Sequence, residues 1–132
     1  MLFDVQVADR EGWIVLAVVG ELDLATAPKV RQAVIRLLAD TDARGADLRV
    51  AIDLSGVDLL DSIGLGVMIG ALRRVRAVGG SLALVVSEPR LLALFAATDL
   101  DRVFTIHPDL DTVLGGVRDP GADPAPGGRI DG

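Results

Sequence analysis

The side chains best placed to do chemistry in this chain lie in the segment from Asp61 to Gly66, which reads Asp-Ser-Ile-Gly-Leu-Gly. The segment follows an apolar run that predicts a strand over residues 48–54, and it begins a helical pattern that extends to about Val78. A helix N-terminus presents free N–H groups and partial positive charge, and both favour an anion. The Ser62 hydroxyl could therefore cap the helix, act as a nucleophile or carry a phosphate.

Three interpretations of this segment compete. The first is structural, since Asp and Ser are favoured at helix N-caps and glycines allow close packing. The second is a regulatory serine. A phosphate on Ser62 would meet the free N–H groups of the helix and also the neighbouring Asp61 carboxylate, and it would add a charge of about −1.5 to −2 at the surface. Such a charge could repel a partner without unfolding the domain.

The third interpretation is dinucleotide binding. Gly64, Gly66 and Gly70 precede a helical pattern, and Glu88 lies at the end of the next predicted strand, near the ribose-binding position of a Rossmann unit. The first glycine of that motif should follow its strand almost directly. A predicted loop over residues 55–62 intervenes, which counts against this interpretation.

Other catalytic chemistries have little support in the sequence. A Ser-based hydrolase is disfavoured because the chain has no Gly-x-Ser-x-Gly turn and its one histidine, His107, lies far along the chain in a predicted turn. Carboxylates pair in two predicted loops, Glu21 with Asp23 and Asp58 with Asp61, where solvated or capping roles are usual. With one histidine and no cysteine, we expect no metal site and no cofactor.

The composition favours one globular domain. The 132 residues carry a formal net charge of −6 and 3% aromatic side chains, which disfavour nucleic-acid binding. No apolar run approaches the ~20 residues that cross a bilayer, and residues 1–4 do not begin a signal peptide, so no membrane association is expected. The absence of cysteine is in keeping with a cytoplasmic protein.

Strand and helix patterns alternate in the order β-β-α-β-α-β-α-β-α. The predicted strands cover residues 3–8, 13–19, 48–54, 81–86 and 103–106, with Gly20 ending the second. The predicted helices begin after a cap at Asp23 or Thr26, near Ser62, at Pro89 and at Asp109.

This order predicts an α/β fold. The first two strands form an antiparallel hairpin around Glu11-Gly12, and the later alternation implies a mostly parallel sheet of four to five strands with about four helices. Residues 1–115 are expected to form the domain. Residues 116–132, rich in Gly, Pro and Asp, are expected to be a disordered tail.

Four short motifs follow one another along the chain. They are Gly20-Glu21-Leu22-Asp23 before a helix, Ile52-Asp53-Leu54-Ser55 at the end of a strand, the segment from Asp61 to Gly66, and Gly79-Gly80 before a core strand. On these motifs, residues 3 to about 114 resemble the STAS domain family and, more narrowly, the bacterial anti-sigma factor antagonists. The resemblance implies the STAS fold and a regulatory protein that is not an enzyme.

In that family, the serine directly after the aspartate is phosphorylated by the anti-sigma factor, a serine kinase of the GHKL ATPase type. The resemblance puts this serine at Ser62, and it puts an acidic residue important for partner contact at Asp23. The partner-binding residues it implies are Asp23, Asp61, Ser62, Ile63, Gly64 and Leu65. This chain has Ile63 where many members have a second hydroxyl, so Ser62 is the hydroxyl available at the site.

The resemblance thus implies partner switching in a stress response. The unphosphorylated chain, a cytoplasmic monomer when free, would bind the kinase and so release a sigma factor to transcription. Phosphorylation of Ser62 would weaken that complex, and a phosphatase would restore it. Two alternatives stay open: a STAS scaffold that is never phosphorylated, in a stress-signalling or lipid-transport assembly, and a nucleotide-binding enzyme that uses the glycine segment.

Overall fold

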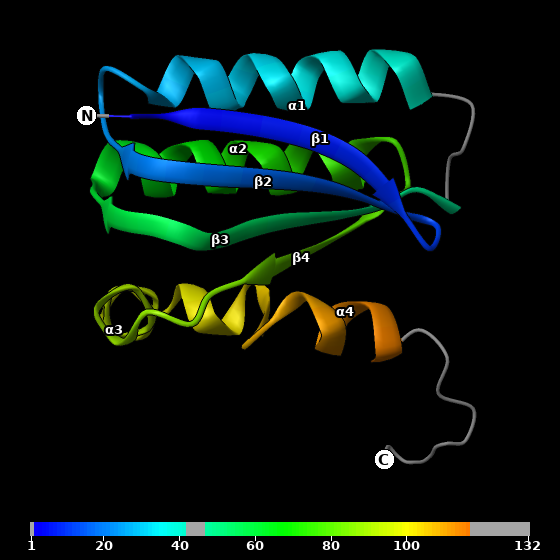
Figure 1. Cartoon of the computed structure of the whole chain (residues 1–132). Coiled ribbons are helices and arrows are strands. Elements are labelled where there is room, and N and C mark those ends of the chain that lie inside the picture. The colour runs from blue at the N-terminus through cyan, green and yellow to red at the C-terminus, as the bar shows by residue number, and fades with distance from the viewer. Residues whose placement is uncertain (1, 42–46, 117–132) are drawn as a thin grey trace.

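The computed structural model describes residues 2–41 and 47–116, and Figure 1 shows the course of the chain. The strands are β1 (Asp4–Arg10), β2 (Trp13–Leu22), β3 (Arg49–Leu60), β4 (Ser81–Val85) and β5 (Thr105–His107). The helices are α1 (Ala27–Thr41), α2 (Ser62–Ala77), α3 (Pro89–Ala97) and α4 (Leu110–Gly116), with a short 3₁₀ turn, η2 (Leu100–Arg102). The predicted order of strands and helices is confirmed.

The five strands form one sheet in the order β1-β2-β3-β4-β5. The first pair is antiparallel and the other three pairs are parallel. The hairpin turns at Glu11 and Gly12, whose φ angles of 54° and 86° are both positive, as a two-residue turn of type I′ requires. The predicted α/β fold, with an N-terminal hairpin strand on a mostly parallel sheet, is confirmed.

Helices cover both faces of the sheet. In Figure 1, α1 and α2 run along one side of it, and α4 lies away from them. The apolar side chains of α1 and α2 form the main core with the inward residues of the strands. Leu91 and Phe95 of α3 belong to the same cluster. On the other face, Val113 and Leu114 of α4 pack on Trp13 and its neighbours. This packing fixes the ends of β2 and β3 against the first turns of α1 and α2.

Strands β2 and β3 extend well beyond their predicted ends, and β5 covers residues 105–107 where residues 103–106 were predicted. Strand β2 continues through Gly20 to Leu22, and β3 continues beyond Leu54 to Leu60. The apolar runs that predicted these two strands stop before the strands do, but the backbones stay paired in parallel through two register shifts. Gly20 lies inside the strand with φ of 112°, and an added Cβ there would lie 2.5 Å from the Leu2 carbonyl oxygen, so the glycine permits close approach and does not end the strand.

The longer β3 removes the loop predicted over residues 55–62. Asp61 is the single residue between β3 and α2. The objection to a dinucleotide site that rested on that loop is therefore wrong.

The predicted domain boundary lies at the end of the last helix. Gly116 ends α4, so the helix reaches one residue into the segment predicted to be a tail. The other predicted tail residues, 117–132, lie outside the described residues, and their disorder stays a prediction. Within residues 2–41 and 47–116, no helix has the length and apolar character needed to cross a membrane.

Candidate functional site at the ends of strands β2 and β3

Two short turns meet at the carboxyl ends of β2 and β3. Leu22 and Leu60 are the last paired residues of the two strands, and the Asp61 N–H donates to the Leu22 carbonyl oxygen at 3.3 Å. Asp23 and Asp61 each follow directly on these strand ends. The structure therefore brings the two predicted acidic residues to one edge of the sheet, although they are far apart in the chain.

Asp61 is the N-cap of α2. Its backbone is extended, with φ of −105° and ψ of −173°, and its Oδ1 accepts hydrogen bonds of 3.0 Å from the N–H groups of Ile63 and Gly64. The carboxylate thus satisfies donors that the first helical turn leaves unpaired. The capping interpretation is right for Asp61.

Ser62 is not the cap of α2. It is the first residue of α2 and is exposed to solvent. Among the described residues, none forms a hydrogen bond with its hydroxyl. Because the neighbouring carboxylate caps the helix, the hydroxyl of Ser62 is not needed as a cap.

The next three residues divide between surface and core. Ile63 keeps 44% of its side chain exposed, whereas Gly64 and Leu65 are buried. A Cβ on Gly64 would lie 2.5 Å from Leu60 Cδ1, so glycine is needed for α2 to pack on the strand ends. Ser62 and Ile63 thus form the outward part of the segment. A direct partner contact by Gly64 or Leu65 stays a prediction.

The same geometry explains the glycine pattern without a nucleotide. The Asp61 carboxylate takes the N–H groups that a phosphate would need, and Gly64 packs against the strand ends. Glu88, the proposed ribose ligand, instead caps α3 by accepting from the Arg90 N–H at 3.1 Å. That backbone hydrogen bond, together with one from the Arg90 side chain, lowers the pKa of Glu88. The nucleotide-binding alternative therefore has no phosphate site at this helix.

Asp23 organises the turn before α1. Its Oδ1 accepts from the N–H groups of Ala25 and Thr26, at 3.0 and 3.2 Å. In return, the Thr26 hydroxyl accepts from the Asp23 N–H at 3.0 Å and donates to the Glu21 carbonyl oxygen at 2.7 Å. Asp23 and Thr26 thus hold the turn before α1 closed, because these hydrogen bonds lie within residues 21–26 and α1 begins at Ala27. A capping role for either residue stays a prediction. The half-buried Asp23 carboxylate has a structural role whether or not it also contacts a partner.

A groove of about 380 Å³ begins at these turns and runs between α1 and α2. Its lining comes from the Asp23 turn, from α1 and from α2: Leu24, Ala27, Pro28, Arg31, Ser62, Ile63, Gly66, Val67, Gly70 and Arg74. The sequence analysis did not identify Leu24, Arg31 or Arg74 as site residues. For Arg31 and Arg74 the available signal was helical spacing, which says which face of a helix is polar and not which helix lies opposite. Leu24 lies in the turn before α1 and had no such signal.

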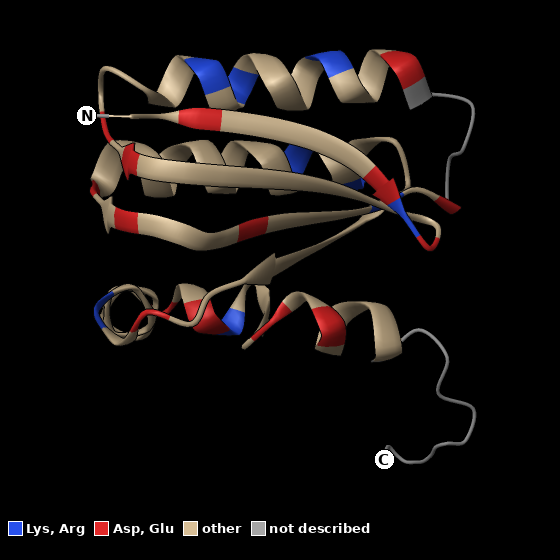
Figure 2. Cartoon of the chain, in the orientation of Figure 1, with Lys and Arg blue, Asp and Glu red and all other residues tan. Residues whose placement is uncertain are grey.

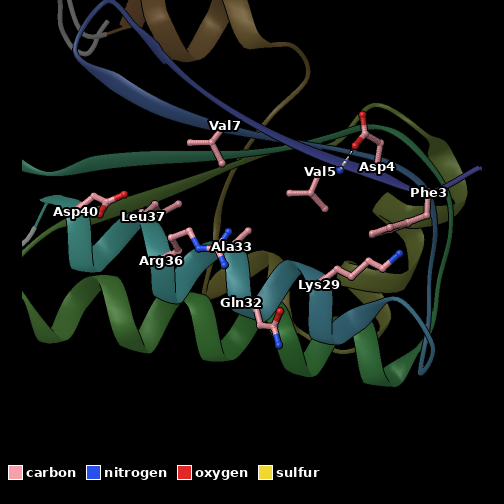
Figure 3. A pocket seen from close by; sticks show the side chains of 10 residues that line it. All are labelled: Phe3, Asp4, Val5, Val7, Lys29, Gln32, Ala33, Arg36, Leu37 and Asp40. Atoms are coloured by element: carbon pink, nitrogen blue, oxygen red, sulfur yellow. Dashed lines mark hydrogen bonds between the residues drawn. The ribbon is translucent and has the colours of Figure 1, made fainter.

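A second hollow lies between β1 and α1. It measures about 430 Å³, and Figure 3 shows its apolar floor of Phe3, Val5 and Val7 beside Lys29 and Arg36 of α1. None of the predicted site residues lines it. The hollow beside Ser62 is therefore the one relevant to the predicted site, although it is the smaller of the two.

The other polar groups considered in the sequence lie away from Ser62. His107 was predicted in a turn, but it is the last residue of β5, where it pairs with Val85 of β4. It is thus separated from β3 by β4, and burial lowers the pKa of its imidazole. Within the part of the chain that the structure describes, no three His, Asp or Glu side chains are grouped to hold a metal ion.

Comparison with known proteins gives consistent matches. The family model of the STAS domain matches residues 4–113. The chain is 37% identical over 106 residues to the anti-sigma-B factor antagonist of Bacillus subtilis, covering 80% of this chain and 92% of that protein. It is 33% identical over 129 residues to the anti-sigma-F factor antagonist RsfB of Mycobacterium tuberculosis, covering 96% and 93%.

A solved structure agrees with the fold. The crystal structure of an anti-sigma factor antagonist from Mycobacterium paratuberculosis superimposes with a TM-score of 0.77 at 32% identity. The match covers 89% of this chain and 96% of that one.

Proposed function

Because this chain belongs to the STAS domain family, we propose that it is an anti-sigma factor antagonist that is switched off by phosphorylation of Ser62. The two relatives named above are anti-sigma factor antagonists, and the match to this chain covers nearly the whole length of each. Antagonists of this family are regulatory binding proteins rather than enzymes, so the chain would be the substrate of a kinase. Its partner would be an anti-sigma factor with serine kinase activity of the GHKL type.

The observation that carries this proposal is the free hydroxyl of Ser62. Asp61 caps α2 in its place, and the serine projects from the first helical turn into solvent. One turn further along, a Cβ at Gly66 would meet no atom within 4 Å. A kinase active site could therefore approach the hydroxyl closely, without moving the core.

Charge would provide the switch. A phosphate on Ser62 would add about −1.5 to −2 charges beside the Asp61 carboxylate. That carboxylate already holds the N–H groups of Ile63 and Gly64, so those donors are not free to neutralise the phosphate. The new charge would repel the partner at the surface and leave the domain folded.

The contact surface would combine the two turns at the strand ends. Asp23 and Leu24 lie on one turn, and Ser62 and Ile63 lie on the other, beside the same groove. Binding there would free a sigma factor for transcription in the cytoplasm. A phosphatase acting on phospho-Ser62 would return the chain to its binding form.

The test is a phosphorylation assay with the anti-sigma factor kinases of the source organism. Each purified kinase is incubated with ATP and the chain, and intact mass is measured with Ser62→Ala as the matched control. We expect one phosphate on the wild type and none on the variant. Equal phosphorylation of both proteins would place the site elsewhere. Tight binding of a partner with no phosphate on the wild type would favour the scaffold alternative.

A further inference from the structure

The helical layer formed by α1 and α2 is basic, although the chain as a whole is acidic. These two helices carry six Lys and Arg side chains and one acidic side chain, in a protein with a formal net charge of −6. The basic residues are Lys29, Arg31, Arg36, Arg73, Arg74 and Arg76. Figure 2 shows blue along α1 and α2, with much of the red at strand ends and near α4. The layer of α1 and α2 therefore carries net positive charge within an acidic chain.

The groove that contains Ser62 passes through this basic layer. Ser62, Gly66, Gly70 and Arg74 recur at every fourth residue and so lie along one face of α2. The Arg74 Nη1 atom lies 3.2 Å from the position that a Cβ on Gly70 would take. The guanidinium thus folds back over the glycine toward the groove. Arg31 lines the same groove from α1.

Both arginines are exposed and available. Within the described residues, neither Arg31 nor Arg74 forms an ion pair or a side-chain hydrogen bond. A free guanidinium presents a planar fork of donors that matches a carboxylate in two parallel hydrogen bonds. The groove therefore offers two unused anion-binding side chains, one on each wall.

The end of the groove nearest Ser62 is apolar. Leu24 keeps 73% and Ile63 keeps 44% of its side-chain surface exposed, and both line this end. Exposed apolar side chains next to unpaired arginines are typical of protein interfaces, in which Arg and apolar anchors are enriched. A polyanion such as DNA would gain little from these leucine and isoleucine side chains, and no aromatic side chain lines the groove to stack on bases.

We propose that this groove receives an acidic segment of a protein partner, with an apolar side chain against Leu24 and Ile63 and carboxylates on Arg31 and Arg74. The identity of the partner as an anti-sigma factor rests on the function proposed above. Because Ser62 and Arg31 line the same groove, a phosphate on Ser62 would also compete with the acidic segment for Arg31. Arg74 lies about three helical turns further along α2, roughly 18 Å away, and would stay with the segment. Regulation would then act through lost attraction as well as through repulsion.

The first test measures affinity for the anti-sigma factor kinase by titration calorimetry at low and high salt. Arg31→Glu and Arg74→Glu are compared with Arg36→Glu, a matched control on α1 that lines the other hollow. We expect Kd to rise about tenfold or more for each groove variant and to change little for the control. The salt dependence should fall in the groove variants only. Equal affinities for wild type, Arg31→Glu and Arg74→Glu would overturn the proposal.

The second test does not depend on the anti-sigma role. Amide chemical shifts of the chain are followed while a synthetic helical peptide of Leu and Glu residues is added, and a DNA duplex is added to a separate sample. We expect the peptide to shift Leu24, Ile63, Gly66 and Gly70, and Arg31→Glu to abolish these shifts. Equal shifts with the duplex, or peptide shifts elsewhere, would overturn the proposal. If no anti-sigma factor binds the wild type, the proposed function fails. The peptide titration then still shows whether the groove binds an acidic segment.

Discussion

The Asp61 carboxylate accepts the Gly64 N–H at 3.0 Å, so the cap of α2 comes from the residue before Ser62 and not from the serine itself. The sequence alone did not say which of the two residues caps the helix and which is available for modification. Asp61 holds the helix end in place, and Ser62 presents a hydroxyl that the fold does not use. Stability and regulation should therefore respond to different substitutions at adjacent positions.

Ser62→Ala is expected to leave stability unchanged, because the hydroxyl caps nothing. The free energy of unfolding in urea should stay within about 0.5 kcal/mol of wild type. Asp61→Ala, the matched comparison, removes the cap and should lose about 1 kcal/mol. An equal loss in both variants would show that the serine supports the helix end after all.

Ser62→Asp is expected to weaken binding to the anti-sigma factor, since it adds a negative charge beside Asp61. Ser62→Asn is the control, because it has nearly the same size and no charge. The aspartate carries about half the charge of phosphoserine, so the effect should be partial and should shrink at high salt. Identical affinities for the Asp and Asn variants at low salt would contradict an electrostatic switch.

The order of elements and the start of α2 could be predicted from the sequence, because local patterns determine them. Apolar runs marked the core strands, and the Asp-Ser pair marked the helix start. The ends of β2 and β3 could not be predicted in this way. Beyond Gly20 and Leu54, pairing between parallel backbones keeps the strands extended after the apolar runs have ended.

The groove was also beyond a sequence prediction. Arg31 and Arg74 belong to helices separated by a whole strand, and they face one groove only after α1 and α2 pack side by side. The motif around Ser62 predicted where a site would lie, whereas the residues that surround it depend on tertiary packing. The predicted contact residues Gly64 and Leu65 illustrate the difference, since both turn toward the core.

Two glycines of α2 should respond in opposite ways to alanine. At Gly64 an added Cβ would lie 2.5 Å from Leu60 Cδ1 and 3.0 Å from Leu22 Cγ, so Gly64→Ala should lose about 1–3 kcal/mol of stability. At Gly66 the space is open, so Gly66→Ala should gain up to about 1 kcal/mol through helix propensity. Urea denaturation of both variants measures the difference. A stable Gly64→Ala protein would show that α2 can shift away from the strand ends.

Stability should fall slightly in mild acid because of His107. Burial lowers the pKa of its imidazole below the ordinary 6.5, and the Asp109 charge opposes this only in part. As the pH falls below about 6.5, the unfolded chain binds the proton first, so stability is lost until the pH passes below the folded pKa. His107→Gln should flatten this part of the profile, measured by denaturation between about pH 8 and about pH 5. An unchanged slope in the variant would assign the effect to other groups.

Asp23→Ala separates partner recognition from folding. The carboxylate accepts from the N–H groups of Ala25 and Thr26, so a stability loss of about 1 kcal/mol is expected in any case. Thr26 cannot replace it freely, because its hydroxyl already donates to the Glu21 carbonyl oxygen. If the carboxylate also contacts the kinase, affinity should fall further, by about 2–5 kcal/mol.

Thr26→Val provides the control for that measurement, since it loosens the same turn and keeps the Asp23 carboxylate. Chemical denaturation and kinase affinity are measured on the same samples of both variants. We expect similar stability losses and a much larger affinity loss for Asp23→Ala, because a loosened turn alone affects both proteins alike. If the two variants lose affinity equally, Asp23 acts only by shaping the turn, and the partner must contact Leu24 and its neighbours instead.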